Sequence, residues 1–83
     1  MREIDLRAHR GGPVDQLTPS ELLVCEEVAA GATNREIAEN LYVTVKAVEF
    51  HIHNAFLKFD VNNRTQLALA YLAVRESEEQ SVG

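Results

Sequence analysis

The stretch TNREIAENLYVTVKAVEFHIHNAFLKF, residues 33–59, determines the expected fold, because it holds two helical patterns separated by a short break. The first pattern opens with Thr33 and Glu36, which form a capping box, a pair whose side chains accept hydrogen bonds from each other's backbone N–H. The second opens with Thr44, a residue type that caps the free N–H groups of a helix. We therefore expect a short helix over residues 34–41, a tight turn, and a longer helix over residues 45–59.

The 45–59 segment has two distinct sides. Apolar residues recur at helical spacing on one side, which predicts that this side packs in the core: Val45, Val48, Ile52, Ala55, Phe56 and Phe59. The other side forms an exposed stripe of Lys46, Glu49, Phe50 and His53. Leu57 follows the same spacing, but its simplest interpretation is a position in the core or at its margin.

Two further helix starts flank this pair. Upstream, the capping box of Thr18 and Glu21 with Pro19 predicts a helix over residues 19–30 that ends at Gly31. Downstream, NRTQ (63–66) predicts a helix over residues 64–74 that is apolar almost all round, so another element or molecule has to cover it. The expected fold class is all-α, a four-helix domain of the helix-turn-helix kind over residues 17–74.

The two ends of the chain lack these patterns. Residues 1–16 contain Gly11, Gly12 and Pro13 without a sustained period, which indicates a flexible linker or arm. An arm that packs or touches a partner is the alternative. Residues 75–83 lose the apolar stripe and are expected to form a disordered tail.

The net charge of −5 over 83 residues argues against nucleic-acid binding, because phosphate neutralisation normally supplies much of the affinity. The charge is unevenly distributed, however. Between residues 33 and 64 the cations Arg35, Lys46, Lys58 and Arg64 balance four anions, so this half is neutral. The excess acid lies in the 19–30 helix and in the tail.

The composition of the chain argues against several classes of function. No apolar run approaches the roughly 18 residues of a membrane span, and the single Cys25 cannot form an internal disulfide, so we expect a cytoplasmic protein that is not in a membrane. No glycine-rich phosphate loop or catalytic grouping is visible, so we expect neither an enzyme nor a cofactor. His51 and His53 point about 200° apart on a helix, which argues against a metal site.

Four ordered blocks resemble the LuxR-type helix-turn-helix domain that the NarL and GerE proteins share. They are LTPSE (17–21), VAAGATNREIA (28–38), VTVKAVEFH (43–51) and KFDV with RTQL (58–61 and 64–67). The resemblance implies a transcription regulator whose 45–59 helix enters the major groove of double-stranded DNA. It also implies a homodimer paired through the last helix, and an attached sensory or signalling domain in many members.

Carried over residue by residue, the resemblance assigns three sets of side chains. It places toward the base edges Lys46, Glu49, Phe50 and His53. It places at or near the phosphates Arg35, Thr44, Lys58 and Arg64. It places in the dimer seam Leu69, Tyr71 and Leu72. The sequence departs from the family pattern at Cys25, Ala47 and Asp60, where leucine, threonine and glycine are usual, and at Glu49, where many members have lysine.

The exposed stripe leaves two functions open. Glu49 can accept a hydrogen bond from the N4 amino group of cytosine, or simply pair with His53 one turn on. Phe50 can cover a thymine methyl, meet a hydrophobic partner, or belong to a slightly rotated core. The first function is sequence-specific DNA binding as the C-terminal output domain of a regulator. The second is a degenerate helix-turn-helix that serves as a protein-interaction module without binding DNA.

Overall fold

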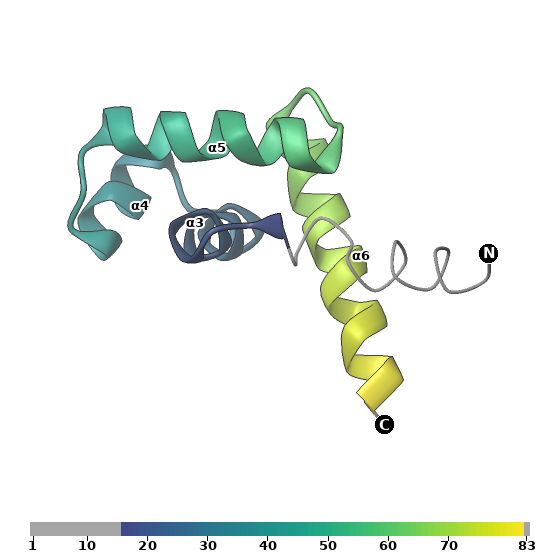
Figure 1. The fold of residues 1–83 in the computed structure, drawn as a ribbon. Coiled ribbons are helices and arrows are strands. Elements are labelled where there is room, and N and C mark those ends of the chain that lie inside the picture. Colours follow the sequence, from purple (N-terminus) through teal and green to yellow (C-terminus); the bar gives the residue numbers. More distant parts are fainter. Residues whose placement is uncertain (1–15, 83) are drawn as a thin grey trace.

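The computed structural model describes residues 16–82, and this part of the chain folds into four helices without a strand (Figure 1). They are α3 (Pro19–Ala29), α4 (Asn34–Leu41), α5 (Val45–Phe59) and α6 (Arg64–Val82). The all-α fold is as expected, the bounds of α4 and α5 match those predicted, and α3 ends one residue earlier. The predicted arm lies, except for Gln16, outside the described residues. None of the described helices is long and apolar enough to cross a membrane.

Local chemistry sets the helix starts. In α3 the Thr18 hydroxyl accepts from Glu21 N at 3.1 Å, while Thr18 N donates to the Glu21 carboxylate at 3.1 Å. Thr33 and Glu36 form the same box in α4, at 3.1 and 2.9 Å. In α5 the Thr44 hydroxyl accepts from the backbone N–H of the third helical residue at 3.0 Å, but no carboxylate completes a box. The N-terminus of α5 therefore keeps more of its positive helix-dipole charge than those of α3 and α4.

Three residues with positive φ follow the first three helices. Gly31 has φ +92, in the region that glycine enters without a steric cost. Tyr42 and Asp60 both have φ +59, and each caps the helix before it. Aspartate enters this region more readily than most residues, which explains how Asp60 replaces the glycine usual in the resembled family.

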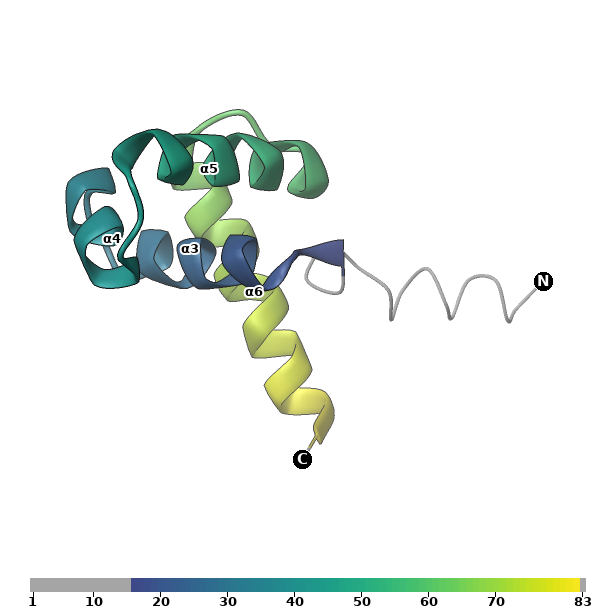
Figure 2. The ribbon, with the colours of Figure 1, turned by 60° about the vertical axis from the view of Figure 1, so that its left-hand side comes forward.

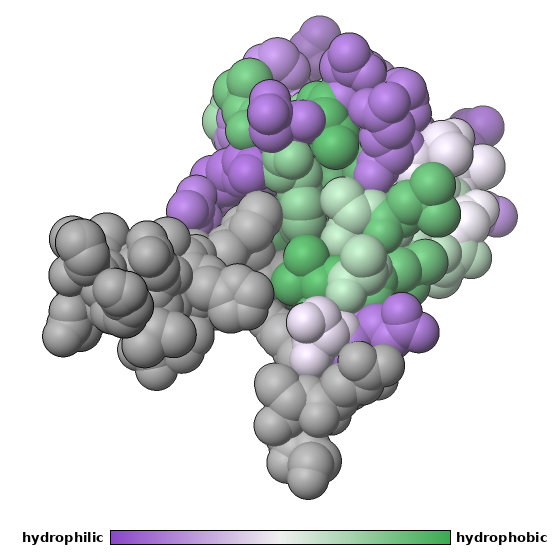
Figure 3. Space-filling model, turned by 90° about the vertical axis from the view of Figure 1, so that its right-hand side faces the viewer, coloured by the Kyte–Doolittle hydropathy of each residue, from purple (hydrophilic) through white to green (hydrophobic). Residues whose placement is uncertain are grey.

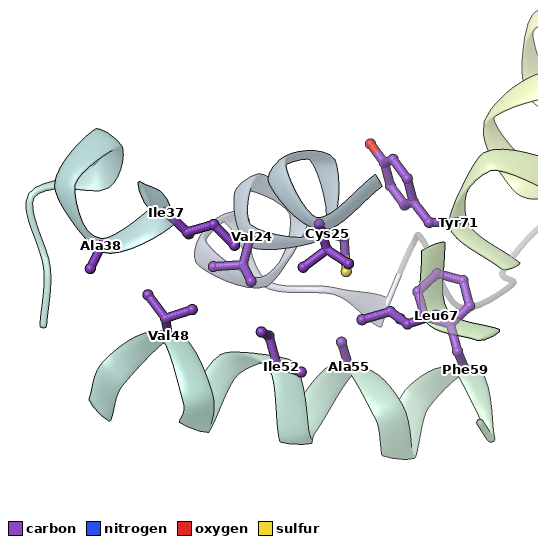
Figure 4. Packing of buried hydrophobic residues seen from close by; sticks show 11 residues of the cluster. Val24, Cys25, Ile37, Ala38, Val48, Ile52, Ala55, Phe59, Leu67 and Tyr71 are labelled. Carbon is purple, nitrogen blue, oxygen red and sulfur yellow. The ribbon is translucent and has the colours of Figure 1, made fainter. Parts of the chain in front are cut away.

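The core lies where α3, α5 and α6 meet, and α4 covers one end of it (Figure 4). Its buried hydrophobic residues are Val24, Cys25, Val28, Ile37, Ala38, Val48, Ile52, Ala55, Phe59, Leu67 and Tyr71. Burial, with Glu21 and Glu26 nearby, raises the pKa of Cys25 to about 11, so its thiol behaves as a small hydrophobic group.

The structure differs from the sequence expectations at three places. Val45, in the first turn of α5, is 39% exposed instead of buried. Leu57 is 67% exposed, so its assignment to the core or its margin is wrong. Helix α6 continues to Val82, where a disordered tail was expected from residue 75; the segment has no glycine or proline before Gly83, and each added helical residue gains one backbone hydrogen bond. The end of α6 extends beyond the other helices (Figure 2).

Candidate nucleic-acid interface

Helices α4 and α5 form a rigid pair around the turn at Tyr42. Val43 N donates to Ala38 O at 3.0 Å, which closes the turn on the end of α4. Ile37 and Ala38 of α4 are buried with Val48 of α5, so the core fixes how α5 is oriented against α4. Locking the inner side of α5 in this way leaves its outer side on the surface.

The outer side of α5 is an exposed stripe of five side chains: Lys46, Glu49, Phe50, His53 and Leu57. Phe50 is 61% exposed, which removes the interpretation that it belongs to a rotated core. Its ring meets that of His51 in a T-shaped arrangement, with ring centroids 5.6 Å apart. No hydrogen bond or ion pair joins Glu49 to His53 among the described contacts, so the pairing that the spacing allows is not formed. All four side chains predicted to face bases therefore point to solvent on one side of one helix.

Two of the four residues expected near phosphates use their donors inside the protein. Lys58 Nζ donates to the Glu21 carboxylate at 2.5 Å and to Gln16 O at 3.0 Å. Arg64 donates to Asn34 Oδ1 and to Ala32 O, both at 2.6 Å. These bonds tie the last turn of α5 to the start of α3, and the start of α6 to the loop before α4.

The other two residues expected near phosphates are Arg35 and Thr44. Both are exposed, and Arg35 has no side-chain partner among the described residues. Lys46, also without such a partner, lies one turn along α5 from Phe50. The free positive charge of the α4–α5 pair is thus concentrated at Arg35, Lys46 and the N-terminus of α5.

Glu21 does more than complete the capping box of α3 that the sequence predicted. It is 4% exposed, and burial alone would raise the pKa of its carboxyl group. Hydrogen bonds from Lys58, from the Thr18 backbone and from Asn54, with the Lys58 charge, outweigh that effect and lower the pKa. The ionised carboxylate thus organises groups from α3 and α5, a role that only long-range contacts reveal.

The outer side of α6 forms a second surface of interest. Leu69 and Leu72 are 63% and 48% exposed, and with Ala29 and Ala30 at the end of α3 they help to line a shallow groove. This face of the molecule shows a broad hydrophobic area in Figure 3. Apolar area of this kind commonly marks a contact surface.

Tyr71 is placed differently from the other two residues expected in the seam. It is 2% exposed, and its hydroxyl donates to Glu26 Oε2 of α3 at 3.2 Å while accepting from Arg75 at 2.8 Å. The structure therefore assigns Tyr71 to the core and the link between α3 and α6. Leu69 and Leu72 remain as the exposed apolar pair.

The histidines of α5 show no shared site. His51 is half-buried, and its Nδ1 atom is buried without a hydrogen-bond partner, whereas His53 is exposed. No group of three metal-ligating side chains is found within residues 16–82.

A short helix, a tight turn and a longer helix with a solvent-facing stripe define the helix-turn-helix class of domain. Comparison with protein families narrows this class: the model described as "Bacterial regulatory proteins, luxR family" matches residues 15–71. The chain belongs to this family.

Three curated bacterial proteins illustrate the relationship. The transcriptional regulatory protein LiaR of Bacillus subtilis is 46% identical over 69% of this chain and 27% of its own length. A nitrate/nitrite response regulator protein homolog of Haemophilus influenzae is 32% identical over 78% of this chain and 31% of its own length. The B. subtilis transcriptional regulatory protein ComA is 40% identical, over 66% and 26%. The chain thus spans about a quarter to a third of these relatives. No solved structure matches it.

Proposed function

We propose that this chain is the DNA-binding output domain of a transcription regulator, with α5 as the helix that enters the major groove. The observation that carries the proposal is the outer stripe of α5, where four side chains suited to base edges are exposed together: Lys46, Glu49, Phe50 and His53. The opposite side of the same helix is held in the core, so the stripe is presented in a fixed orientation. Family membership supports the same function.

Contacts to phosphate come mainly from Arg35, Thr44 and the N-terminus of α5 in this proposal. Exposed cations, hydroxyl groups and helix N-termini are common sources of contacts to the DNA backbone. The resemblance assigns phosphate contacts to Lys58 and Arg64 as well, but their bonds to Glu21 and Asn34 occupy donors that such contacts need, so their part in binding is smaller in this proposal. The affinity of a single subunit for DNA is therefore low. Strong binding depends on the pairing of two subunits.

Pairing takes place through the exposed apolar side of α6. Leu69 and Leu72 are both exposed, and a homodimer that joins them to the same residues of a partner protomer brings two α5 helices into one assembly, as paired half-sites require. The relatives are named as regulators. These proteins are three to four times as long as the segment that matches this chain. An attached sensory or signalling domain is accordingly part of the proposal.

Titration with DNA at low and moderate salt tests the proposal. We expect salt-sensitive binding. Because the charge of Lys46 attracts DNA of any sequence in addition to any base contact, we expect Lys46→Ala to weaken binding to all sequences and to reduce the magnitude of the slope of log K against log salt by about one. Lys46 is exposed, so the unfolding temperature of the variant should match that of the wild type, which serves as the control. Absence of binding at low salt and high protein concentration would contradict the function.

Glu49→Ala should behave differently from Lys46→Ala. A carboxylate repels phosphate but accepts from the cytosine N4 amino group, so its removal should relax preference at one base position without weakening binding overall. Selection of bound sequences from a random DNA pool, done in parallel for wild type and variant, measures this preference. An unchanged preference would end the base-contacting role of Glu49.

The second candidate function is a protein-interaction module that has lost DNA binding. It is favoured by the exposure of Phe50 and Leu57 on a surface with little free positive charge. A DNA titration without salt-sensitive binding would support this function over the first.

A further inference from the structure

Two large apolar side chains stand on the outer side of α5 without cover. Phe50 is 61% exposed and Leu57 is 67% exposed, although sequence spacing suggested that Leu57 belongs at the core. They lie seven residues apart, which places them on the same side of the helix two turns apart. Neither belongs to the group of side chains that packs against the core.

The surroundings of this pair differ from those of a protein-docking surface. Between and beside the two apolar side chains lie Lys46, Glu49 and His53, all exposed. The interior of a protein–protein interface is typically depleted of charged residues, and here apolar and polar side chains alternate. The groove beside α6 differs in that its apolar residues Ala29, Ala30, Leu69, Leu72 and Ala73 adjoin one another, with the charged groups Glu26, Arg75 and Glu76 also in its lining. Alternation of single apolar groups with polar ones suits the edges of bases in the major groove, where thymine carries a methyl group among donors and acceptors.

Side chains that bind purine edges are scarce on this stripe. Guanine is usually contacted by Arg or Lys, and adenine by Asn or Gln. The asparagine of α5, Asn54, is half-buried and hydrogen-bonds to Glu21, and Lys46 is the one cation on the stripe. Recognition by α5 therefore depends heavily on groups that pyrimidines display.

The spacing of the pair fixes the spacing of its targets. Seven helical residues correspond to about 10.5 Å along the helix axis, and successive bases on one DNA strand are about 3.4 Å apart along the duplex. We propose that Phe50 and Leu57 each cover the 5-methyl group of a thymine, and that the two thymines lie about three base pairs apart in each half-site. This inference rests on the proposed function and names Leu57 as a further specificity-determining residue.

Replacement of thymine by deoxyuridine tests the proposal, because it removes the methyl group and leaves the base-pairing groups unchanged. The 83-residue chain is used to select a binding sequence, and each thymine of that sequence is then replaced in turn. We expect two positions per half-site at which deoxyuridine weakens binding by the wild type about three- to fivefold. This factor corresponds to losing the burial of one methyl-sized group. All other thymines should be insensitive.

Variants assign each methyl group to its side chain. Phe50→Ala should remove the effect of deoxyuridine at one of the two positions, and Leu57→Ala should remove it at the other. Leu23→Ala is the matched control: Leu23 is exposed on α3, away from the stripe, and this variant should keep both effects. Thermal unfolding confirms that all three variants are folded.

The outcomes separate the two proposals. A defined selected sequence with no sensitive thymine, or a Leu57→Ala variant that keeps the wild-type pattern, overturns the methyl contacts and leaves DNA binding intact. Failure to select any sequence, with no salt-sensitive binding, overturns the proposed function together with this inference.

Discussion

Leu69→Glu is expected to leave the domain folded and monomeric, with binding to a two-half-site DNA weakened by about 100-fold or more. Leu69 is 63% exposed on the groove side of α6, so the substitution does not disturb the core, but it introduces a charge into the apolar contact that we propose between protomers. Without pairing, the second half-site no longer benefits from the high effective concentration that the first binding event creates. Analytical ultracentrifugation and fluorescence anisotropy measure the two effects.

A DNA with one half-site provides the control for this prediction. Its affinity should be the same for Leu69→Glu and wild type, because the outer side of α5 is unchanged. Unaltered affinity of the variant for the two-half-site DNA would show that α6 does not form the seam.

Lys58→Met is expected to destabilise the fold by about 2 kcal/mol, the cost of leaving a buried carboxylate without its charged partner. Glu21 is 4% exposed and lies at the start of α3, and Lys58 also donates to the backbone of Gln16. The variant therefore loses a link between two helices together with an ion pair. Urea unfolding followed by circular dichroism gives the free energy of unfolding.

Lys46→Met is the matched control, because it removes a cation from an exposed position of the same helix. Its effect should stay within about 0.5 kcal/mol. Adding Glu21→Leu to Lys58→Met should recover part of the loss, since no buried charge remains. Equal effects of Lys46→Met and Lys58→Met would refute the structural role of the ion pair.

Acid should remove the stabilisation that the ionised Glu21 carboxylate provides. Because the folded-state pKa of Glu21 is lowered from its ordinary value of 4.5, its stabilisation is complete above that value and is lost as the pH falls through the folded-state pKa. The difference in unfolding free energy between wild type and Glu21→Gln should therefore shrink below about pH 4.5.

The helices were predictable because their starts depend on neighbouring residues. Thr18, Thr33 and Thr44 each cap within three residues of themselves, so short-range chemistry was sufficient for α3, α4 and α5. The outer side of α5 was predictable for a related reason. Helical spacing places Phe50 on the opposite side of the helix from Val48 and Ile52, whichever helices pack against α5.

The remaining differences depend on contacts between distant parts of the chain. Lys58 and Glu21 are 37 residues apart, and Arg64 and Asn34 are 30 apart, so their bonds are not visible in any local pattern. Tyr71 was ambiguous because α6 is apolar almost all round, and only the packing of α3 shows which side is covered. Leu57 resembles a core residue in type and is exposed because no helix within residues 16–82 passes over it.

If the chain has the proposed function, the internal bonds of Lys58 and Arg64 also affect how the regulator searches a chromosome. Sliding along DNA requires long residence on arbitrary sequence, and residence there depends on the number of phosphates that are neutralised. Because two of the four cations between residues 33 and 64 are bonded within the fold, we expect a protomer to leave non-operator DNA quickly. We expect the search to proceed by frequent dissociation and rebinding in three dimensions, and occupancy of the operator to respond promptly when the concentration of paired protein changes.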